Sequence, residues 1–118
     1  IAWGDGKPVR DFIHSCDVAR GMIFAAQYGS GIALNLGSGT GISIKNLVEA
    51  VLENVDPKPE IRWNTDQPSG DALRILDTTK ASSLGFKPQI SLRDGIRGVM
   101  EWYRQNRTET GQRYEIFD

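Results

Sequence analysis

The spacing of apolar residues along the chain predicts short β-strands that alternate with α-helices. Apolar positions repeat at helical spacing in four segments, and shorter runs of apolar and β-branched residues favour strands. Short strands that alternate with helices are typical of an α/β fold. We expect strands at residues 10–13, 32–36 and 60–63, and helices at residues 18–28, 44–55, 78–84 and 92–106.

Polar residues and prolines mark where these helices begin and end. Asp17 precedes the first apolar stripe and Ser43 precedes the second, so each is expected to be an N-cap. Ser91 and Asp94 have the spacing of a capping box before the last helix. Residues 56–59 are expected to break the second helix, because their two prolines cannot continue it.

The composition describes an ordinary globular chain. Its 118 residues are enough for one compact domain, and 39% hydrophobic with 25% charged residues favour a packed core over disorder. The net charge of −1 gives no indication of a nucleic-acid or membrane partner, and no apolar run is long enough to span a bilayer. A single cysteine, Cys16, fits a reducing compartment, so we expect a cytoplasmic protein.

The most distinctive chemistry lies near the start, where a glycine-rich turn separates Trp3 from Arg10. Two glycines and a proline in residues 4–8 predict a tight turn, since glycine tolerates positive φ and proline fixes its own φ. An indole and a guanidinium beside this turn suit a phosphate-bearing ligand, because the guanidinium presents paired donors. The alternative is a buried Trp3 and an Arg10 that is solvated or paired with Asp11 or Asp17.

A second glycine-rich turn, residues 37–41, follows a predicted strand and precedes a predicted helix, as an anion-binding turn would. A dinucleotide fingerprint needs a third glycine where Ile42 stands, so that interpretation fails on spacing. The alternating glycines resemble the first motif of S-adenosylmethionine-dependent methyltransferases, although Asn35 replaces the usual acidic residue. The simplest interpretation is a connecting turn, with the methyltransferase kept as an alternative.

Three landmarks, taken in order, resemble the extended short-chain dehydrogenases/reductases of the NAD-dependent epimerase/dehydratase family. Residues 10–14 and 17–19 match the family's arginine-acid-aromatic-Ile-His segment and the Asp-Val-Ala that follows it. Residues 35–39 match its Asn-x-Gly-x-Gly turn, and residues 68–77 match the third landmark. The resemblance covers nearly all of residues 3–106, and the order and spacing of the landmarks make it specific.

Two groups within this family have especially similar patterns. The spacing of the tryptophan and arginine in residues 3–10, together with the pattern of residues 68–77, is similar to that of GDP-L-fucose synthases. Asp71 with its preceding glycine is similar to a pair in UDP-glucose 4-epimerases, but Pro68 stands where those epimerases have a phosphate-binding arginine. This departure favours the synthase pattern, in which Arg74 has a counterpart.

The resemblance implies the small C-terminal substrate-binding part of an NAD(P)-binding Rossmann-fold enzyme. Residues 1–106 would form the nucleotide-sugar-binding domain and residues 107–118 a polar tail. NAD or NADP would bind an N-terminal Rossmann domain that is absent from this chain, and the full-length enzyme would be a homodimer. No tyrosine here begins the family's Tyr-x-x-x-Lys motif, so we expect the chain to be inactive alone, and its start at Ile1 adds to the expectation of a longer protein.

The resemblance also implies which residues bind the nucleotide-diphosphate sugar. Arg10 would hold the diphosphate, Trp3 would border the sugar or phosphate, Asp71 would accept hydrogen bonds from ribose hydroxyls, and Arg74 would contact phosphate. No catalytic, cofactor-binding or metal-binding residue is expected in the chain. His14 is expected to be a hydrogen-bonded structural residue.

Several alternatives stay open on the sequence. The chain would serve either as part of an enzyme or as a stand-alone module that binds a nucleotide sugar without catalysis. Epimerase, dehydratase and reductase are not separated by these residues, nor are the base and the sugar. Two smaller expectations are that Asn35 fastens its glycine turn and that Cys16 is buried.

Overall fold

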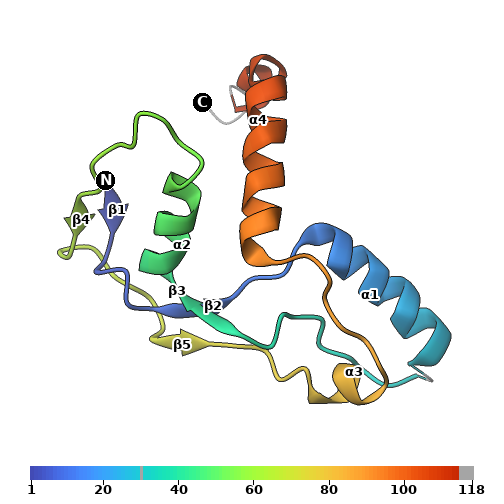
Figure 1. Ribbon diagram of the computed structural model, residues 1–118. Coiled ribbons are helices and arrows are strands. Elements are labelled where there is room, and N and C mark those ends of the chain that lie inside the picture. The colour runs from blue at the N-terminus through green and yellow to red at the C-terminus, as the bar shows by residue number, and fades with distance from the viewer. Residues whose placement is uncertain (30, 115–118) are drawn as a thin grey trace.

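The computed structural model describes the backbone of residues 1–29 and 31–114, and side chains as far as residue 106. The α/β fold predicted from the sequence is confirmed, with short strands alternating with helices (Figure 1). The elements are β1 (Ala2–Trp3), β2 (Val9–Asp11), α1 (Ser15–Tyr28), β3 (Gly41–Ser43), α2 (Ile44–Leu52), β4 (Trp63–Asn64), β5 (Leu73–Arg74), α3 (Thr79–Ser83) and α4 (Leu92–Tyr114).

Two small sheets organise the strands. β2 lies in the middle of a three-stranded sheet, antiparallel to β3 and parallel to β5, and β1 pairs in parallel with β4. Figure 1 shows α2 and α4 standing side by side next to the three-stranded sheet, with α1 and α3 beyond one end and β1–β4 beyond the other. The sheet therefore connects two groups of elements that are far apart in the molecule.

The molecule is open in shape, and little of its apolar surface is buried. Its radius of gyration is 17.0 Å, whereas a compact chain of this length is expected near about 13.5 Å. Among the described residues, the buried hydrophobic side chains are Ala50, Ala81 and Phe86. An apolar groove of about 230 Å³ runs between α2, α4 and the segment after β2. The packing of the helices thus leaves apolar surface uncovered.

The first helix begins earlier than predicted, and its N-cap is different. His14 is the N-cap of α1, and its Nδ1 accepts a hydrogen bond from the backbone N–H of Cys16 at 3.2 Å. Asp17, the predicted cap, is instead a fully buried residue within the first turn. Its carboxylate accepts hydrogen bonds from the backbone N–H groups of Gln89 and Ile90, which lie just before α4. The prediction of a structural histidine is confirmed, and the prediction for Asp17 was wrong.

The predicted strand at residues 32–36 is absent, and three strands that the sequence did not predict, β1, β3 and β5, are present. A buried strand needs hydrogen-bonded neighbours, and none of the described strands pairs with residues 32–36. The apolar residues at these positions therefore do not form a strand in this chain, and Ile32 is exposed. β3 and β5 form because each pairs with β2, which is a long-range relation that local patterns do not contain.

The helix starts at Ser43 and Ser91 follow the predictions, but the last helix is longer than expected. Ser43 Oγ accepts from the N–H of Asn46, and Ser91 Oγ accepts from the N–H of Asp94. α4 continues to Tyr114, past the expected end near residue 106, so residues 107–114 are helical in their backbone. The rest of the predicted polar tail, residues 115–118, lies outside the described residues. No helix of the described part combines the length and apolar character needed to cross a membrane.

Candidate functional site

The turn between β1 and β2 is built by its glycines and by contacts with α2. Gly4 and Gly6 have φ of 78° and 73°, which is the left-handed region that glycine tolerates. A side chain at Gly6 would also collide with Trp63, whose Cη2 would lie 2.7 Å from the added Cβ. The carbonyl of Gly6 accepts from the N–H of Lys45 in α2 at 2.8 Å. The predicted tight turn is present, and it sets the path of the chain into β2.

Arg10 and Arg74 are brought together by the pairing of β2 with β5. The two residues are direct partners in this parallel ladder. Neighbouring strands lie about 4.8 Å apart, and partners in register project from the same face of a sheet. Arg10 is half-buried, and its Nη1 donates to the carbonyl of Val9 at 2.8 Å. The pairing therefore places two arginines at adjacent positions of the sheet, although they are 64 residues apart in the sequence.

The expected alternative, an ion pair of Arg10 with a neighbouring aspartate, does not occur. Among the described side chains, Asp17 pairs with Arg20, and the carboxylate of Asp11 accepts from Ser38. The ion pairs of this part of the chain do not include Arg10. The positive charge of Arg10 is thus not neutralised by a carboxylate of the described residues.

Asp71 lies beside Arg74 and forms an ion pair with it. The pair joins Asp71 Oδ2 to Arg74 Nη2, and the side chains are 61% and 72% exposed. An ion pair this exposed contributes little to stability. A ligand can therefore replace either partner of the pair with little loss of folding free energy. Three of the four predicted site residues, Arg10, Asp71 and Arg74, therefore lie at one edge of the sheet.

Trp3 is an exposed aromatic side chain on the other sheet. It lies in β1, opposite Asn64 of β4, and its side chain is 68% exposed. The alternative of a buried tryptophan is therefore wrong. Among the described residues, no aromatic pair or side-chain hydrogen bond joins Trp3 to Arg10.

A loop before β5 bridges the region between Trp3 and Arg10. An added Cβ at Gly4 would lie 2.6 Å from Ser69 Oγ, and one at Gly70 would lie 3.4 Å from Arg10 Nη2. Gly70 has a φ of 72°, so this close approach depends on glycine. The turn and the loop enclose a pocket of about 270 Å³ lined by Asp5, Lys7, Pro8, Ser69, Gly70 and Ala72.

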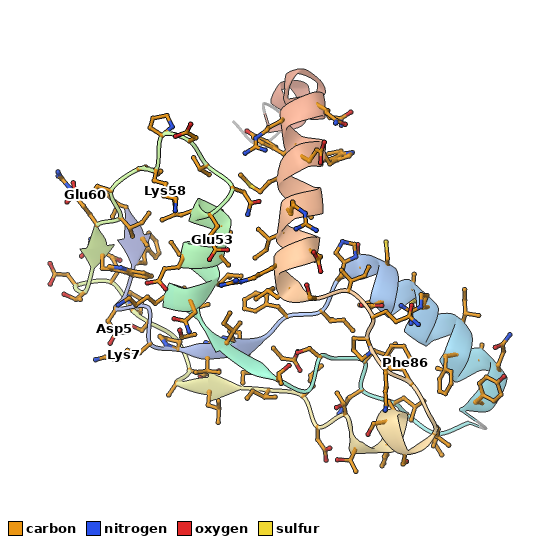
Figure 2. All side chains as sticks on the ribbon, viewed as in Figure 1. Asp5, Lys7, Glu53, Lys58, Glu60 and Phe86 are labelled. Carbon is orange, nitrogen blue, oxygen red and sulfur yellow. The ribbon has the colours of Figure 1, made fainter. Side chains whose placement is uncertain are left out.

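A second ion pair stands at the rim of this pocket. Lys7 Nζ lies 3.0 Å from Asp5 Oδ2, and the backbone N–H of Lys7 donates to Asp5 Oδ1 at 3.0 Å. These two interactions, the backbone hydrogen bond first, lower the pKa of Asp5 below its usual value. Figure 2 shows both side chains projecting outward from the turn, near β2 and β5. Lys7 therefore adds an exposed cation to the side of the molecule that carries the arginines.

The second glycine-rich turn does not offer an anion site, because a carboxylate of the chain already fills it. Asp11 Oδ1 accepts from the N–H of Ser38 at 2.8 Å, and Asp11 Oδ2 accepts from the N–H of Gly39 at 3.0 Å. The hydroxyl of Ser38 also donates to Asp11 Oδ1. These are the donors that a phosphate or a cofactor carboxylate would need. This finding argues against the methyltransferase alternative.

Sequence reasoning missed the role of Asp11 and misplaced two other residues. The sequence contained a signal for this role: Asp11 is an acidic residue next to Arg10, and a glycine-rich turn follows later in the chain. Asn35 does not fasten its own turn; its Nδ2 donates to the carbonyl of Asp77 at 3.0 Å. Cys16 is exposed rather than buried, because it lies on the open side of the first turn of α1. Among the described residues, no group of three His, Cys, Asp or Glu side chains is arranged to hold a metal ion.

Comparison with known proteins agrees with these motifs. Residues 1–37 match the model of the NAD dependent epimerase/dehydratase family. A putative GDP-L-fucose synthase 2 of Arabidopsis thaliana is 40% identical over 107 residues, which are 90% of this chain and 33% of that protein. The resemblance to the NAD dependent epimerase/dehydratase family is confirmed. The chain spans about a third of the length of the curated relatives of this family that it matches.

Solved structures of this family have the same fold over most of the chain. The UDP-glucose 4-epimerase of Thermotoga maritima, determined with UDP-glucose, has a TM-score of 0.79 at 32% identity and covers 88% of this chain and 34% of its own. A GDP-6-OMe-4-keto-L-xylo-heptose reductase from C. jejuni has a TM-score of 0.80 at 36% identity, and the match covers 88% of this chain and 33% of that chain. The relatives thus include an epimerase and a reductase that share one architecture over this segment.

Proposed function

We propose that this chain contributes the nucleotide-diphosphate-sugar-binding part of an NAD(P)-dependent epimerase, dehydratase or reductase. The observation that carries the proposal is the register of β2 with β5, which pairs Arg10 with Arg74 on one face. A diphosphate bears several negative oxygens at neutral pH. Two adjacent guanidinium groups match it with paired donors that stay protonated.

The remaining site residues surround this arginine pair. The exposed indole of Trp3 offers a surface and an N–H donor for the sugar or a phosphate. Asp71 is exposed beside Arg74. Its carboxylate can accept hydrogen bonds from ribose hydroxyls when its ion pair with Arg74 is broken. The pocket of about 270 Å³ between the turn and the loop leaves room for part of such a ligand.

In this proposal the cofactor and the catalytic residues belong to a Rossmann domain outside the chain. The relatives that match are about three times as long as this chain, and one matching structure is described as a GDP-mannoheptose C4 reductase with NADP bound. The open shape and the uncovered apolar groove fit a part that packs against another domain. The chain alone is then inactive, and the whole enzyme is a cytoplasmic homodimer.

The proposal is tested by titrating the chain with GDP and with UDP, using calorimetry at low ionic strength. Arg10→Ala and Arg74→Ala are each expected to weaken binding by at least about tenfold, since a charged hydrogen bond is worth roughly 1.5–3 kcal/mol. Arg62→Ala is the matched control, because Arg62 is also an exposed arginine with a nearby carboxylate, Glu60 at 3.4 Å.

The outcomes separate the parts of the proposal. Unchanged affinity in both arginine variants removes the β2–β5 pair from the site. Equal losses in all three variants indicate only a general charge effect. A parallel titration with NAD and NADP is expected to show no saturable binding to this chain, and saturable binding would overturn the assignment of the cofactor to another domain.

A further inference from the structure

We propose that Asp11 is a positioning residue that holds Arg10 beside Arg74 by filling the glycine turn at residues 37–39. This inference rests on the proposed function, because it concerns how that binding pair is kept in place. Asp11 itself does not contact the ligand in this proposal. Its carboxylate binds the glycine turn on the opposite side of β2 from the guanidinium of Arg10.

Both oxygens of the Asp11 carboxylate accept hydrogen bonds from the glycine turn. Oδ1 accepts from the backbone N–H and the hydroxyl of Ser38, and Oδ2 accepts from the backbone N–H of Gly39 at 3.0 Å. The two amides belong to consecutive residues of one turn, so they fix the carboxylate in position and orientation. Hydrogen bonds to an ionised acceptor of this kind are about twice as strong as neutral ones.

The turn is shaped to admit this carboxylate. A Cβ at Gly37 would lie 2.7 Å from Asp11 Oδ2, so any side chain there would displace the carboxylate. Gly39 has a φ of 69°, and a Cβ on it would lie 2.6 Å from Thr78 Oγ1. Gly37 therefore leaves space for the internal carboxylate, whereas Gly39 is required by its own φ and by the contact with Thr78.

The connection to Arg10 follows from the geometry of a strand. Successive side chains of a strand point to opposite faces, so Asp11 and Arg10 leave β2 on opposite sides. β2 has three residues and is the central strand, with Asp11 opposite Gly41 and Arg10 opposite Arg74. A strand this short has few ladder bonds to hold it. Fixing its end at Asp11 therefore fixes the position of the neighbouring Arg10.

Asp11→Asn is the most selective change, because it keeps the shape of the side chain. The amide would place an NH₂ group against either the N–H of Gly39 or the donors of Ser38. Donor would then face donor, and at least one backbone N–H of the turn would lose its acceptor in the chain. The end of β2 is expected to move to relieve this conflict, which separates Arg10 from Arg74.

Asp17→Asn is the matched control. Asp17 is likewise a carboxylate that accepts from two consecutive backbone amides, those of Gln89 and Ile90, but it fastens α1 rather than β2. Both variants are expected to lower the urea midpoint of unfolding to a similar degree. Only Asp11→Asn is expected to weaken binding of GDP or UDP, by about tenfold, which corresponds to about 1.4 kcal/mol.

A second readout is independent of ligand binding. The Nε–Hε signal of Arg10 in a proton–nitrogen NMR spectrum reports the environment of its guanidinium, and it is assigned by its loss in Arg10→Ala. Asp11→Asn is expected to shift this signal, whereas Asp17→Asn is expected to leave it in place. If the chain binds neither GDP nor UDP, the proposed function fails, yet the Arg10 signal still decides the positioning role.

The inference is overturned if Asp11→Asn leaves both affinity and the Arg10 signal unchanged. It is also overturned if Asp17→Asn changes the affinity and the Arg10 signal as much as Asp11→Asn does, since the effect would then be general destabilisation. Should Asp11→Asn fail to fold, Ser38→Ala decides, because it removes the hydroxyl donor and keeps both backbone amides. A shift of the Arg10 signal in Ser38→Ala supports the inference, and no shift contradicts it.

Discussion

Two aspartates six residues apart, the half-buried Asp11 at the end of β2 and the buried Asp17 in the first turn of α1, both accept hydrogen bonds from distant backbone amides. Asp11 accepts from the turn at residues 38 and 39, and Asp17 accepts from the segment at residues 89 and 90. Arg10 was proposed from a local motif, and its role in binding stays a prediction. The roles of the aspartates were not predictable, because their partners are 27 to 73 residues away along the chain.

Asp17 makes the stability of the fold sensitive to acid. Burial raises the pKa of Asp17, but the N–H groups of Ile90 and Gln89, followed by Arg20, together outweigh burial and hold the pKa below its usual value. A carboxyl with a lowered pKa in the folded state stabilises the fold above its unfolded pKa of about 3.9. That contribution is lost as the pH falls through the lower folded value.

We therefore expect Asp17→Asn to cost about 2 kcal/mol of unfolding free energy at pH 7, because a donor replaces a buried acceptor. The gap between the two proteins should close as the pH falls from about 5 to about 2. Urea unfolding followed by circular dichroism across this range measures the gap. A gap that is independent of pH would show that ionisation of Asp17 does not contribute.

At the scale of elements, helices were easier to predict than strands in this chain. The start of α2 was correct to the residue, because Ser43 carries its own capping signal and Ile44 begins the apolar stripe. β5, by contrast, is two exposed residues that are defined by their pairing with β2. The proposed site depends on that strand. The motif named Arg10 and Arg74 as candidates, but it did not predict that the two would be paired across β2 and β5.

The cap of α2 gives a test at this scale. Ser43→Ala is expected to lower the unfolding free energy by about 1 kcal/mol, because the N–H of Asn46 loses its acceptor. Ser43→Asp should retain most of the stability, since aspartate is an equally good cap. Ser82→Ala is the control: its hydroxyl donates to a carbonyl within α3, and its loss should change stability little. Equal effects of Ser43→Ala and Ser82→Ala in urea titrations would contradict a capping role.

At the scale of the whole molecule, the uncovered apolar surface is the main feature. Met22 and Ile23 on α1 are 64% and 61% exposed, and the groove between α2 and α4 is lined largely by aliphatic side chains. The sequence predicted these apolar stripes correctly. The hydrophobic pattern marks a face for burial without naming what covers it, so the pattern by itself does not say which of these stripes faces outward in this chain.

This surface is expected to make the isolated chain self-associate. Sedimentation velocity over a series of concentrations should show a rising average mass for the unmodified chain. Replacing Met22 and Ile23 together with serine should reduce this rise, because apolar area on α1 is removed. Gln27→Ser, at another exposed position of the same helix, should have no effect. A monomer at every concentration would show that the exposed face of α1 does not drive association.

The contacts of Asp17 also bear on the order in which the chain can fold during synthesis. The carboxylate of Asp17 can pair with the nearby Arg20 early, but it can accept from the amides of residues 89 and 90 only after those residues have been made. The β2–β5 pairing imposes a similar delay, since Val9 meets Leu73. Contacts of such long separation are closed late, after the entropy of a large loop has been lost. The long-range contacts of β2 and α1 therefore form only after residues 73–90 have been made, so apolar residues of this segment stay uncovered by these partners until then.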